Sequence, residues 1–284
     1  MPHATADYEL RIRPSRGWLQ LDLAEVWRYR DLLGMLVRRD FIAKYKQTIL
    51  GPAWFVLQPL LMTLAFTVVF GHVAGIPTDG VPAPLFYLAG LVGWNFFAQT
   101  FQSTSSTLVA NAALLGKVYF PRLIVPLAAA ISNFLALGLQ LATLAVFWLW
   151  YRWFTPATIA LDASVAALPL VLLQIAALSL GLGLWLSALT TKYRDFTFLT
   201  GFIVQLWLYA TPVIYPLSQV PERWRWVAVL NPMTMPVESI RAVVLGAGTV
   251  RPELVAASVV LTFVLFVSGV LVFSRVEKTF VDTV

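Results

Sequence analysis

Six long apolar stretches follow a basic N-terminal segment, and each is long enough to cross a lipid bilayer. They cover residues 49–70, 85–108, 123–150, 163–189, 196–215 and 254–273. An α-helix needs about 20 mostly apolar residues to span the hydrocarbon core. Only helices or closed barrels satisfy their backbone polar groups in lipid, and continuous apolar runs exclude the alternating pattern of a barrel. The sequence therefore predicts an all-α integral membrane protein with six transmembrane helices.

The scarcity of charge agrees with this class. Charged residues make up 12% of the chain and hydrophobic residues 59%, whereas a soluble domain carries about 25% charged residues. The chain has no cysteine, which excludes disulfides and thiol chemistry. The first apolar stretch begins near Ile49, too late in the chain for a cleaved signal peptide. We therefore expect it to be a retained membrane helix.

Lysine and arginine predict the orientation, because they concentrate on the cytoplasmic side of membrane proteins. The side that holds both termini carries 15 of the 20 basic residues, and the opposite side carries five. Both termini are therefore expected in the cytoplasm. The net charge of +6 reflects this topology rather than nucleic-acid binding, since the basic residues flank the apolar stretches.

Residues 18–47 form an amphipathic pattern before the first stretch, with apolar residues at helical spacing and charged residues between them. Asp22 followed by Glu25 resembles a helix-capping box, and Gly34 is expected to divide the segment into two helices. The segment is either an interfacial anchor or a docking helix for a cytoplasmic partner. The periodicity alone favours the anchor.

The second apolar stretch is unusually polar. Its polar residues are Asn95, Gln99, Gln102, Ser103, Thr104, Ser105 and Ser106. Such side chains in a membrane helix face a bundle interior or a wet cavity, and hydrogen bonding between helices is common. The stretch therefore joins helices or lines a passage, and the two roles are compatible.

Residues 216–248 contain two apolar segments that are too short to span a membrane, separated by the turn signal Asn231-Pro232. The segments are 224–230 and 233–245. This pattern fits two short helices that dip back from the external face, or a surface hairpin with tryptophans in the headgroup region. Glu238 and Arg241 lie three residues apart, on one helical face, and are expected to pair.

The sequence lacks the motifs of nucleotide or metal chemistry. It has no G-x-x-x-x-G-K-[ST] run and no H-E-x-x-H run, and its histidines are His3 and His72. No catalytic residue and no metal ligand is therefore assigned. Any active transport would draw its energy from another polypeptide.

A series of recognisable motifs follows one another along nearly the whole chain. They are Trp27–Leu33 with Arg38-Arg39-Asp40, Lys44–Trp54 with Gln58-Pro59, Lys117–Arg122, Lys192-Tyr193-Arg194-Asp195, Thr211–Pro216, and Asn231–Thr234 with Glu238 and Arg241. Together they resemble the membrane permease subunits of type-2 ABC exporters. The subgroup that they resemble exports O-antigen, teichoic acid and capsule polysaccharides.

The resemblance implies a six-span half-transporter that pairs with a second copy of itself and with two cytoplasmic ABC ATPase subunits. ATP and magnesium would be bound by the ATPases, with no cofactor on this chain, which would be a permease and not an enzyme. The substrate would be a lipid-linked glycan of the O-antigen kind, moved across the bacterial inner (plasma) membrane. Residues 1–48 would be the cytoplasmic N-terminal segment, 49–274 the transmembrane domain and 275–284 the cytoplasmic tail. Membrane lipids would surround the chain, and nucleic acid would not be a partner.

The same resemblance assigns roles to particular residues. Contact with the ATPase falls on residues 22–47 and 111–122. The coupling candidates are Arg38, Asp40, Lys117, Tyr119 and Arg122. The first and fifth spans line the translocation path in the family, and the candidate sugar contacts there are Trp54, Trp207 and Tyr209. Residues 217–246 correspond to re-entrant helices that form an external gate.

The gate candidates are Asn231, Glu238 and Arg241. A buried Glu238–Arg241 pair would hold the gate in register. Loss of either partner would then impair export, and charge reversal of both residues together would restore some function.

Three other functions compete with polysaccharide export. The same fold exports drugs or other small hydrophobic molecules, which would require a narrow apolar cavity. A membrane-embedded glycosyltransferase or polymerase would need charged catalytic residues near a membrane face, where Asp40, Lys192, Arg194 and Asp195 lie. Those residues belong to motifs that fit helix ends and coupling better. A passive channel would need a filter-like ring sequence, which the chain lacks.

Overall fold

The computed structural model describes residues 23–155, 162–193 and 195–279, and all regular structure within those ranges is helical. Residues 18–22 of the predicted amphipathic segment lie outside the described residues, as do Arg194 and the end of the predicted tail, 280–284. The capping role expected of Asp22 therefore stays a prediction.

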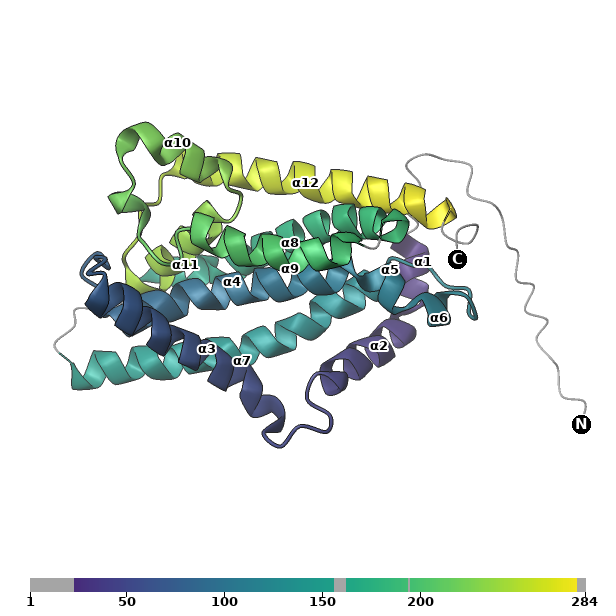
Figure 1. The fold of residues 1–284 in the computed structure, drawn as a ribbon, viewed down its shortest axis with the longest axis horizontal. Coiled ribbons are helices and arrows are strands. Elements are labelled where there is room, and N and C mark those ends of the chain that lie inside the picture. Colours follow the sequence, from purple (N-terminus) through teal and green to yellow (C-terminus); the bar gives the residue numbers. More distant parts are fainter. Residues whose placement is uncertain (1–22, 156–161, 194, 280–284) are drawn as a thin grey trace, which may run out of the picture.

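The helices follow one another in a simple order. They are α1 (Leu23–Arg28), α2 (Arg30–Ala43), η1 (Gly51–Ala53), α3 (Trp54–Phe66), η2 (Thr67–Val73), α4 (Ala83–Ser105), α5 (Thr107–Ala110), α6 (Ala112–Leu115), α7 (Ile124–Phe154), η3 (Ala163–Ala167), α8 (Leu168–Lys192), α9 (Asp195–Ala210), η4 (Leu217–Gln219), α10 (Glu222–Leu230), α11 (Thr234–Leu245) and α12 (Pro252–Thr279). Helices α4, α7, α8, α9 and α12 run along the long axis of the molecule, and α3 lies obliquely to them (Figure 1).

Within the described residues, four helical segments are long and apolar enough to cross a membrane. They are Gly51–Val73, Ile124–Phe154, Ala163–Lys192 and Pro252–Val276. These segments match the first, third, fourth and sixth predicted stretches, and they confirm the prediction of an all-helical membrane protein. The fifth stretch forms α9, which is apolar but has only 16 residues, and the second forms α4.

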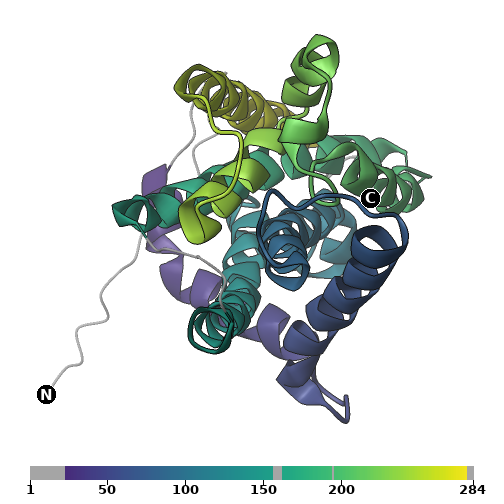
Figure 2. The ribbon, with the colours of Figure 1, turned by 90° about the vertical axis from the view of Figure 1, so that its left-hand side faces the viewer.

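Helix α4 is the central helix of the bundle, and this position explains its polarity. It packs against α3, α7, α8 and α11, and most of its 23 residues are buried (Figure 2). Thr100, Thr104 and Ser105 are buried among these neighbours. A helix surrounded by protein needs no apolar outer face, so α4 carries polar side chains that a lipid-facing helix excludes. The sequence prediction that the polar side chains face the bundle interior is confirmed for Thr104 and Ser105, whereas Gln102 is exposed.

Helices α8 and α12 lie side by side and approach most closely at two glycines (Figure 1). A Cβ atom on Gly181 would lie 2.6 Å from the Cα atom of Phe266, and a Cβ atom on Gly269 would collide with the backbone of Gly181. Small residues at a helix crossing let two backbones meet closely. The contact therefore depends on glycine at both positions.

The two ends of the bundle carry different elements. Helices α1, α2, α5 and α6 lie at the same end as the C-terminal end of α12, and the α10–α11 hairpin lies at the opposite end (Figure 1). The hairpin confirms the prediction of two short helices on either side of Asn231-Pro232. Helix α11 is buried along nearly its whole length against α4 and α8, whereas α10 exposes Trp224 and Trp226.

The division of the amphipathic segment lies at Tyr29 and not at Gly34, so that prediction was wrong. Tyr29 has φ −92° and ψ 21°, outside the helical range, and separates α1 from α2. Gly34 lies within α2. A glycine in a helix interior costs about 1 kcal/mol relative to alanine, which the packing of α2 on α7 offsets.

Candidate functional site

The predicted pair of Glu238 and Arg241 is formed and fully buried. Arg241 Nη1 lies 3.2 Å from Glu238 Oε1. The side chain of Glu238 is 0% exposed and that of Arg241 is 1% exposed. The guanidinium also donates to the carbonyl oxygens of Pro212 (2.5 Å) and Val213 (2.6 Å), just beyond the end of α9. Arginine suits this position because one planar group reaches several acceptors at once.

The carboxylate of Glu238 has its own backbone donors. It accepts hydrogen bonds from the backbone N–H groups of Leu217 (3.2 Å) and Thr249 (2.9 Å). Together, the two side chains join α11 to the segments that precede α10 and follow α11. Breaking the Glu238–Arg241 pair would remove one of the links between the hairpin and the end of α9.

Asn231 provides a second link between the hairpin and α9. Its Oδ1 accepts from Trp207 Nε1 (2.9 Å) and from the backbone N–H of Met233 (3.0 Å). Its Nδ2 donates to the carbonyl oxygen of Ala210 (3.1 Å) and to Thr211 Oγ1 (2.9 Å). Four hydrogen bonds from one carboxamide fix the turn against the last residues of α9.

The three aromatic path candidates do not form one cluster. The ring of Trp207 packs edge-on against Phe97 and Phe101 inside the bundle. Trp54 and Tyr209 are 47% and 53% exposed and make no aromatic ring contact among the residues that the structure describes. The hydrogen bond between Trp207 and Asn231 thus joins a predicted path residue to a predicted gate residue. Sequence reasoning missed this contact.

The two predicted coupling segments lie against each other at the opposite end of the bundle. Leu36 of α2 is buried in a cluster with Phe120 and Ile124. Arg39 Nη2 donates to Asn111 Oδ1 (2.9 Å), which joins α2 to the residue between α5 and α6. The segments 22–47 and 111–122 therefore form one surface, as far as they are described.

The coupling candidates differ in their surroundings. Asp40 pairs with Arg39 at 2.7 Å. Arg38 and Lys117 are exposed, Tyr119 is 69% exposed, and Arg122 is half-buried. Sequence reasoning missed Arg39, although it stands inside the Arg38-Arg39-Asp40 motif. Lys117 and Tyr119 project from the surface, where a partner protein could reach them.

A polar link joins the end of α2 to the bundle interior. Lys44 Nζ donates to Asn133 Oδ1 on α7. Asn133 is 1% exposed, and its Nδ2 lies 3.2 Å from both Thr100 Oγ1 and Ser103 Oγ on α4. Although Lys44 as a residue is exposed, partial burial of its ammonium lowers the pKa of Lys44, and the charge of Asp40 opposes this effect. Sequence reasoning missed this link.

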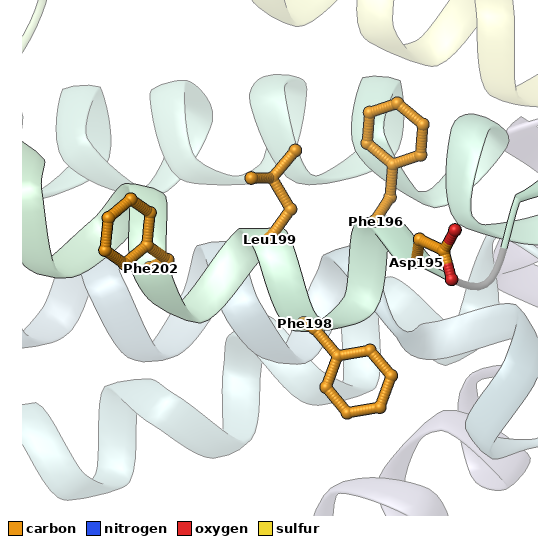
Figure 3. Close-up of a pocket in the computed structure, with 5 residues that line it drawn as sticks. All are labelled: Asp195, Phe196, Phe198, Leu199 and Phe202. Carbon is orange, nitrogen blue, oxygen red and sulfur yellow. The ribbon is translucent and has the colours of Figure 1, made fainter.

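Two hollows accompany these elements. A polar pocket of about 350 Å³ lies between Lys44, the start of α3, α4 and α7. A second, shallow apolar hollow with a volume of about 540 Å³ lies along the start of α9. Phe196 and Leu199 point to one side of this helix and Phe198 to the other (Figure 3). Phe198 is 84% exposed, so this second hollow is an open surface of α9.

Comparisons with known proteins agree with this architecture. A family described as ABC-2 type transporter matches residues 31–245. An O-antigen export system permease protein RfbA of Klebsiella pneumoniae is 27% identical over 255 residues, which is 89% of this chain and 94% of the relative. A second protein of that name from the same organism is 25% identical over 267 residues, which also cover 89% of this chain and 94% of the relative. The protein of that name from Myxococcus xanthus is 30% identical over 226 residues, 77% of this chain and 82% of the relative. The resemblance carried by the motifs is confirmed, and the chain belongs to the ABC-2 type transporter family.

Proposed function

We propose that this protein is the membrane subunit of an ATP-driven exporter that moves lipid-linked polysaccharide of the O-antigen kind across the bacterial inner membrane. The similarity to relatives named for O-antigen export, which extends over 89% of the chain, carries the proposal. A long polar glycan cannot cross hydrocarbon, so its path must be polar and continuous. Exposed aromatic side chains such as Trp54 and Tyr209 suit weak, successive contacts along such a path.

The working assembly contains two copies of this chain and two cytoplasmic ATPase subunits, which bind ATP and magnesium. The lack of a phosphate-binding loop in the sequence supports a separate ATPase. The surface formed by α2 and residues 111–122 would receive it. Lys117 and Tyr119 project from this surface, and the Arg39–Asn111 hydrogen bond would pass movement of the loop to α2.

The chain crosses the membrane six times in this proposal, with both termini in the cytoplasm. Helix α4 crosses surrounded by other helices of the chain. Helix α9 has 16 residues, and the turn that follows it completes the crossing. Residues 1–48 and 275–284 are cytoplasmic, and 49–274 form the transmembrane domain. The placement of α1, α2 and the end of α12 at one end of the bundle supports an even number of crossings (Figure 1).

The α10–α11 hairpin, within residues 217–246, is the external gate. Its turn is fixed to α9 by Asn231, and its second helix is held by Glu238 and Arg241. Trp207 acts here as a support for the gate rather than as a sugar contact, because its indole N–H is used by Asn231.

Deletion of the gene in its host bacterium tests the proposed export. Long-chain glycan should disappear from the cell surface, and lipid-linked glycan should accumulate on the cytoplasmic side. The wild-type gene should restore surface glycan, measured by gel electrophoresis of extracted glycolipid. Unchanged surface glycan in the deletion strain would refute the proposal.

Labelling of single cysteines tests the topology. The chain has no native cysteine, so Val73→Cys and Lys117→Cys each introduce one thiol at an exposed position. A membrane-impermeant maleimide should label the first in intact cells and the second only after permeabilisation. Labelling of both in intact cells would refute the arrangement.

A further inference from the structure

The polar pocket beside α2 has the composition of a ligand site. Five carboxamide side chains line it together with Lys44: Gln58, Asn95, Gln99, Gln102 and Gln140. They come from α3, α4 and α7. A volume of about 350 Å³ is near the lower end of the roughly 300–1,000 Å³ of small-molecule sites. The space fits one small polar group rather than a polymer strand.

The carboxamides of this pocket are not used by the protein itself. Gln140 is 3% exposed, and no protein group in the described ranges donates to its Oε1. Within the same ranges, no hydrogen bond is made by the side chains of the other four carboxamides. Buried polar groups are nearly always hydrogen-bonded, and leaving one unpaired is costly. This cost falls on Gln140, because Gln58 and Gln102 are exposed and Asn95 and Gln99 are half-buried. The buried, unpaired acceptor of Gln140, with four more carboxamides around the same hollow, therefore points to a ligand that donates hydrogen bonds there.

Lys44 adds a positive charge that forms no ion pair within the described residues. Its ammonium has three N–H donors, and one of them points to Asn133. The nearest carboxylate on its own segment, Asp40, is paired with Arg39 at 2.7 Å. Partial burial lowers the pKa of Lys44, so an anion in the pocket would stabilise the charged form. A phosphate is an acceptor that lysine commonly binds.

Part of the remaining wall is aromatic. Trp54 and Phe55 line the same pocket, and an aromatic face packs on the apolar face of a sugar ring. A carboxamide both donates and accepts hydrogen bonds, which matches hydroxyl groups that do the same. The combination of carboxamides, one cation and a tryptophan is therefore complementary to a hydroxylated ring that carries a phosphate.

We propose that this pocket binds a phosphorylated sugar, with the phosphate at Lys44 and the sugar hydroxyls at the carboxamides. The ligand in the cell is the head of the exported glycan, where the first sugar meets its phosphate-bearing carrier, and in this respect the inference rests on the proposed function. The pocket lies on the side of α2 and would hold this head group at the cytoplasmic end of the path.

Binding of glucose 1-phosphate to the purified full-length chain tests the inference. The chain is placed in nanodiscs of phosphatidylcholine, and binding is followed by saturation-transfer NMR of the probe. Glucose 1-phosphate should bind about tenfold more tightly than glucose or inorganic phosphate. Lys44→Met should weaken glucose 1-phosphate about tenfold and leave glucose unchanged. Lys46→Met is the matched control, because Lys46 is exposed and does not line the pocket.

A second variant protects the test against misfolding of Lys44→Met. Gln99 is half-buried and makes no side-chain hydrogen bond among the described residues, so Gln99→Leu should fold normally and weaken both glucose 1-phosphate and glucose. Equal binding by wild type and by both variants would overturn the proposal, as would absence of binding to a folded wild-type chain. Equal affinity for inorganic phosphate would overturn the assignment of a sugar.

Two further outcomes separate neighbouring hypotheses. Displacement of the probe by phosphatidylglycerol added to the nanodiscs would overturn the proposal by making the pocket a lipid headgroup site. Normal surface glycan in the deletion strain, with glucose 1-phosphate still bound by the purified chain, would refute the export function and leave the binding site standing. Lost surface glycan without any binding of glucose 1-phosphate would refute the site alone.

Discussion

The guanidinium of Arg241 lies over the ring of Phe86, with its Cζ atom 3.6 Å from the ring centre. This contact joins α11 to the central helix α4 and places a cation on an aromatic face in buried surroundings. The same guanidinium donates to two carbonyl oxygens at the end of α9 and to Glu238. One side chain thus links α11 to α4 and to the segment that follows α9.

Replacement of Arg241 by alanine should unfold the hairpin region at lower temperature and impair export. The loss leaves Glu238 charged and buried without its partner, a change that costs about 3–5 kcal/mol. Arg241→Lys should recover little, because an ammonium cannot reach both carbonyls and cover the ring as a planar group does. Thermal unfolding of the purified chain measures the effect. Arg223→Lys at an exposed position of α10 is the matched control and should leave stability unchanged.

Charge reversal of the pair should not restore function, contrary to the expectation from sequence alone. In the swapped protein a carboxylate would face the carbonyl oxygens of Pro212 and Val213, and a cation would face the N–H groups of Leu217 and Thr249. Both new groups would meet unfavourable dipoles. Surface glycan in a strain that carries Glu238→Arg with Arg241→Glu should stay as low as in the single variants. Recovery to half the wild-type level would show that the backbone partners are unimportant.

The sequence predicted features that depend on local patterns. Apolar length predicted six stretches, and four of them form helices long and apolar enough to cross a membrane. The Asn231-Pro232 turn predicted the break between α10 and α11, and the three-residue spacing predicted the Glu238–Arg241 pair. Each of these depends on residues that are close in the chain. The division at Tyr29 was missed because propensity marks glycine as the weak point of a helix, whereas packing against α7 holds Gly34 helical.

The sequence did not predict contacts between residues far apart in the chain. Arg39 and Asn111 are 72 positions apart, and Lys44 and Asn133 are 89 apart. The pocket needs glutamines from α4 and α7 to meet, and only the packing of these helices decides that Gln99 and Gln140 face one hollow. The polarity of the second stretch indicated a wet or buried face, but not its neighbours.

Removal of the unpaired carboxamide of Gln140 should stabilise the protein. A buried acceptor without a partner costs about 1–3 kcal/mol, so Gln140→Leu should raise the melting temperature. Gln174 gives the matched comparison, because its Nε2 donates to Ser258 Oγ at 2.9 Å across the α8–α12 contact. Gln174→Leu should lower the melting temperature. A fall of similar size in both variants would mean that Gln140 has a partner and a structural role.

Alanine at Gly181 should separate α8 from α12. The new Cβ atom would lie 2.6 Å from Phe266 Cα and 2.8 Å from Leu265 O, and backbone atoms cannot move away as a flexible side chain can. Loss of the close crossing should lower stability by about 1–3 kcal/mol, the usual cost of overpacking. Gly138→Ala is the matched control on α7, because a Cβ atom there would meet no other atom within 4 Å. That variant should gain about 0.5–1 kcal/mol, and equal melting temperatures for the two variants would contradict the close contact.

The last prediction concerns Lys117 and Tyr119, on the surface formed by α2 and residues 111–122 that we propose contacts the ATPase. The side chains of Lys117 and Tyr119 are exposed and make no hydrogen bond or ring contact within the described ranges, so Lys117→Ala with Tyr119→Ala should leave the free energy of unfolding within about 0.5 kcal/mol of wild type. Surface glycan should nevertheless fall to the level of the deletion strain, because contact with the ATPase is lost. Asn111→Ala should act differently, since it removes the acceptor of Arg39 and should lower both stability and export. Normal surface glycan in the double variant would place the ATPase contact elsewhere on the chain.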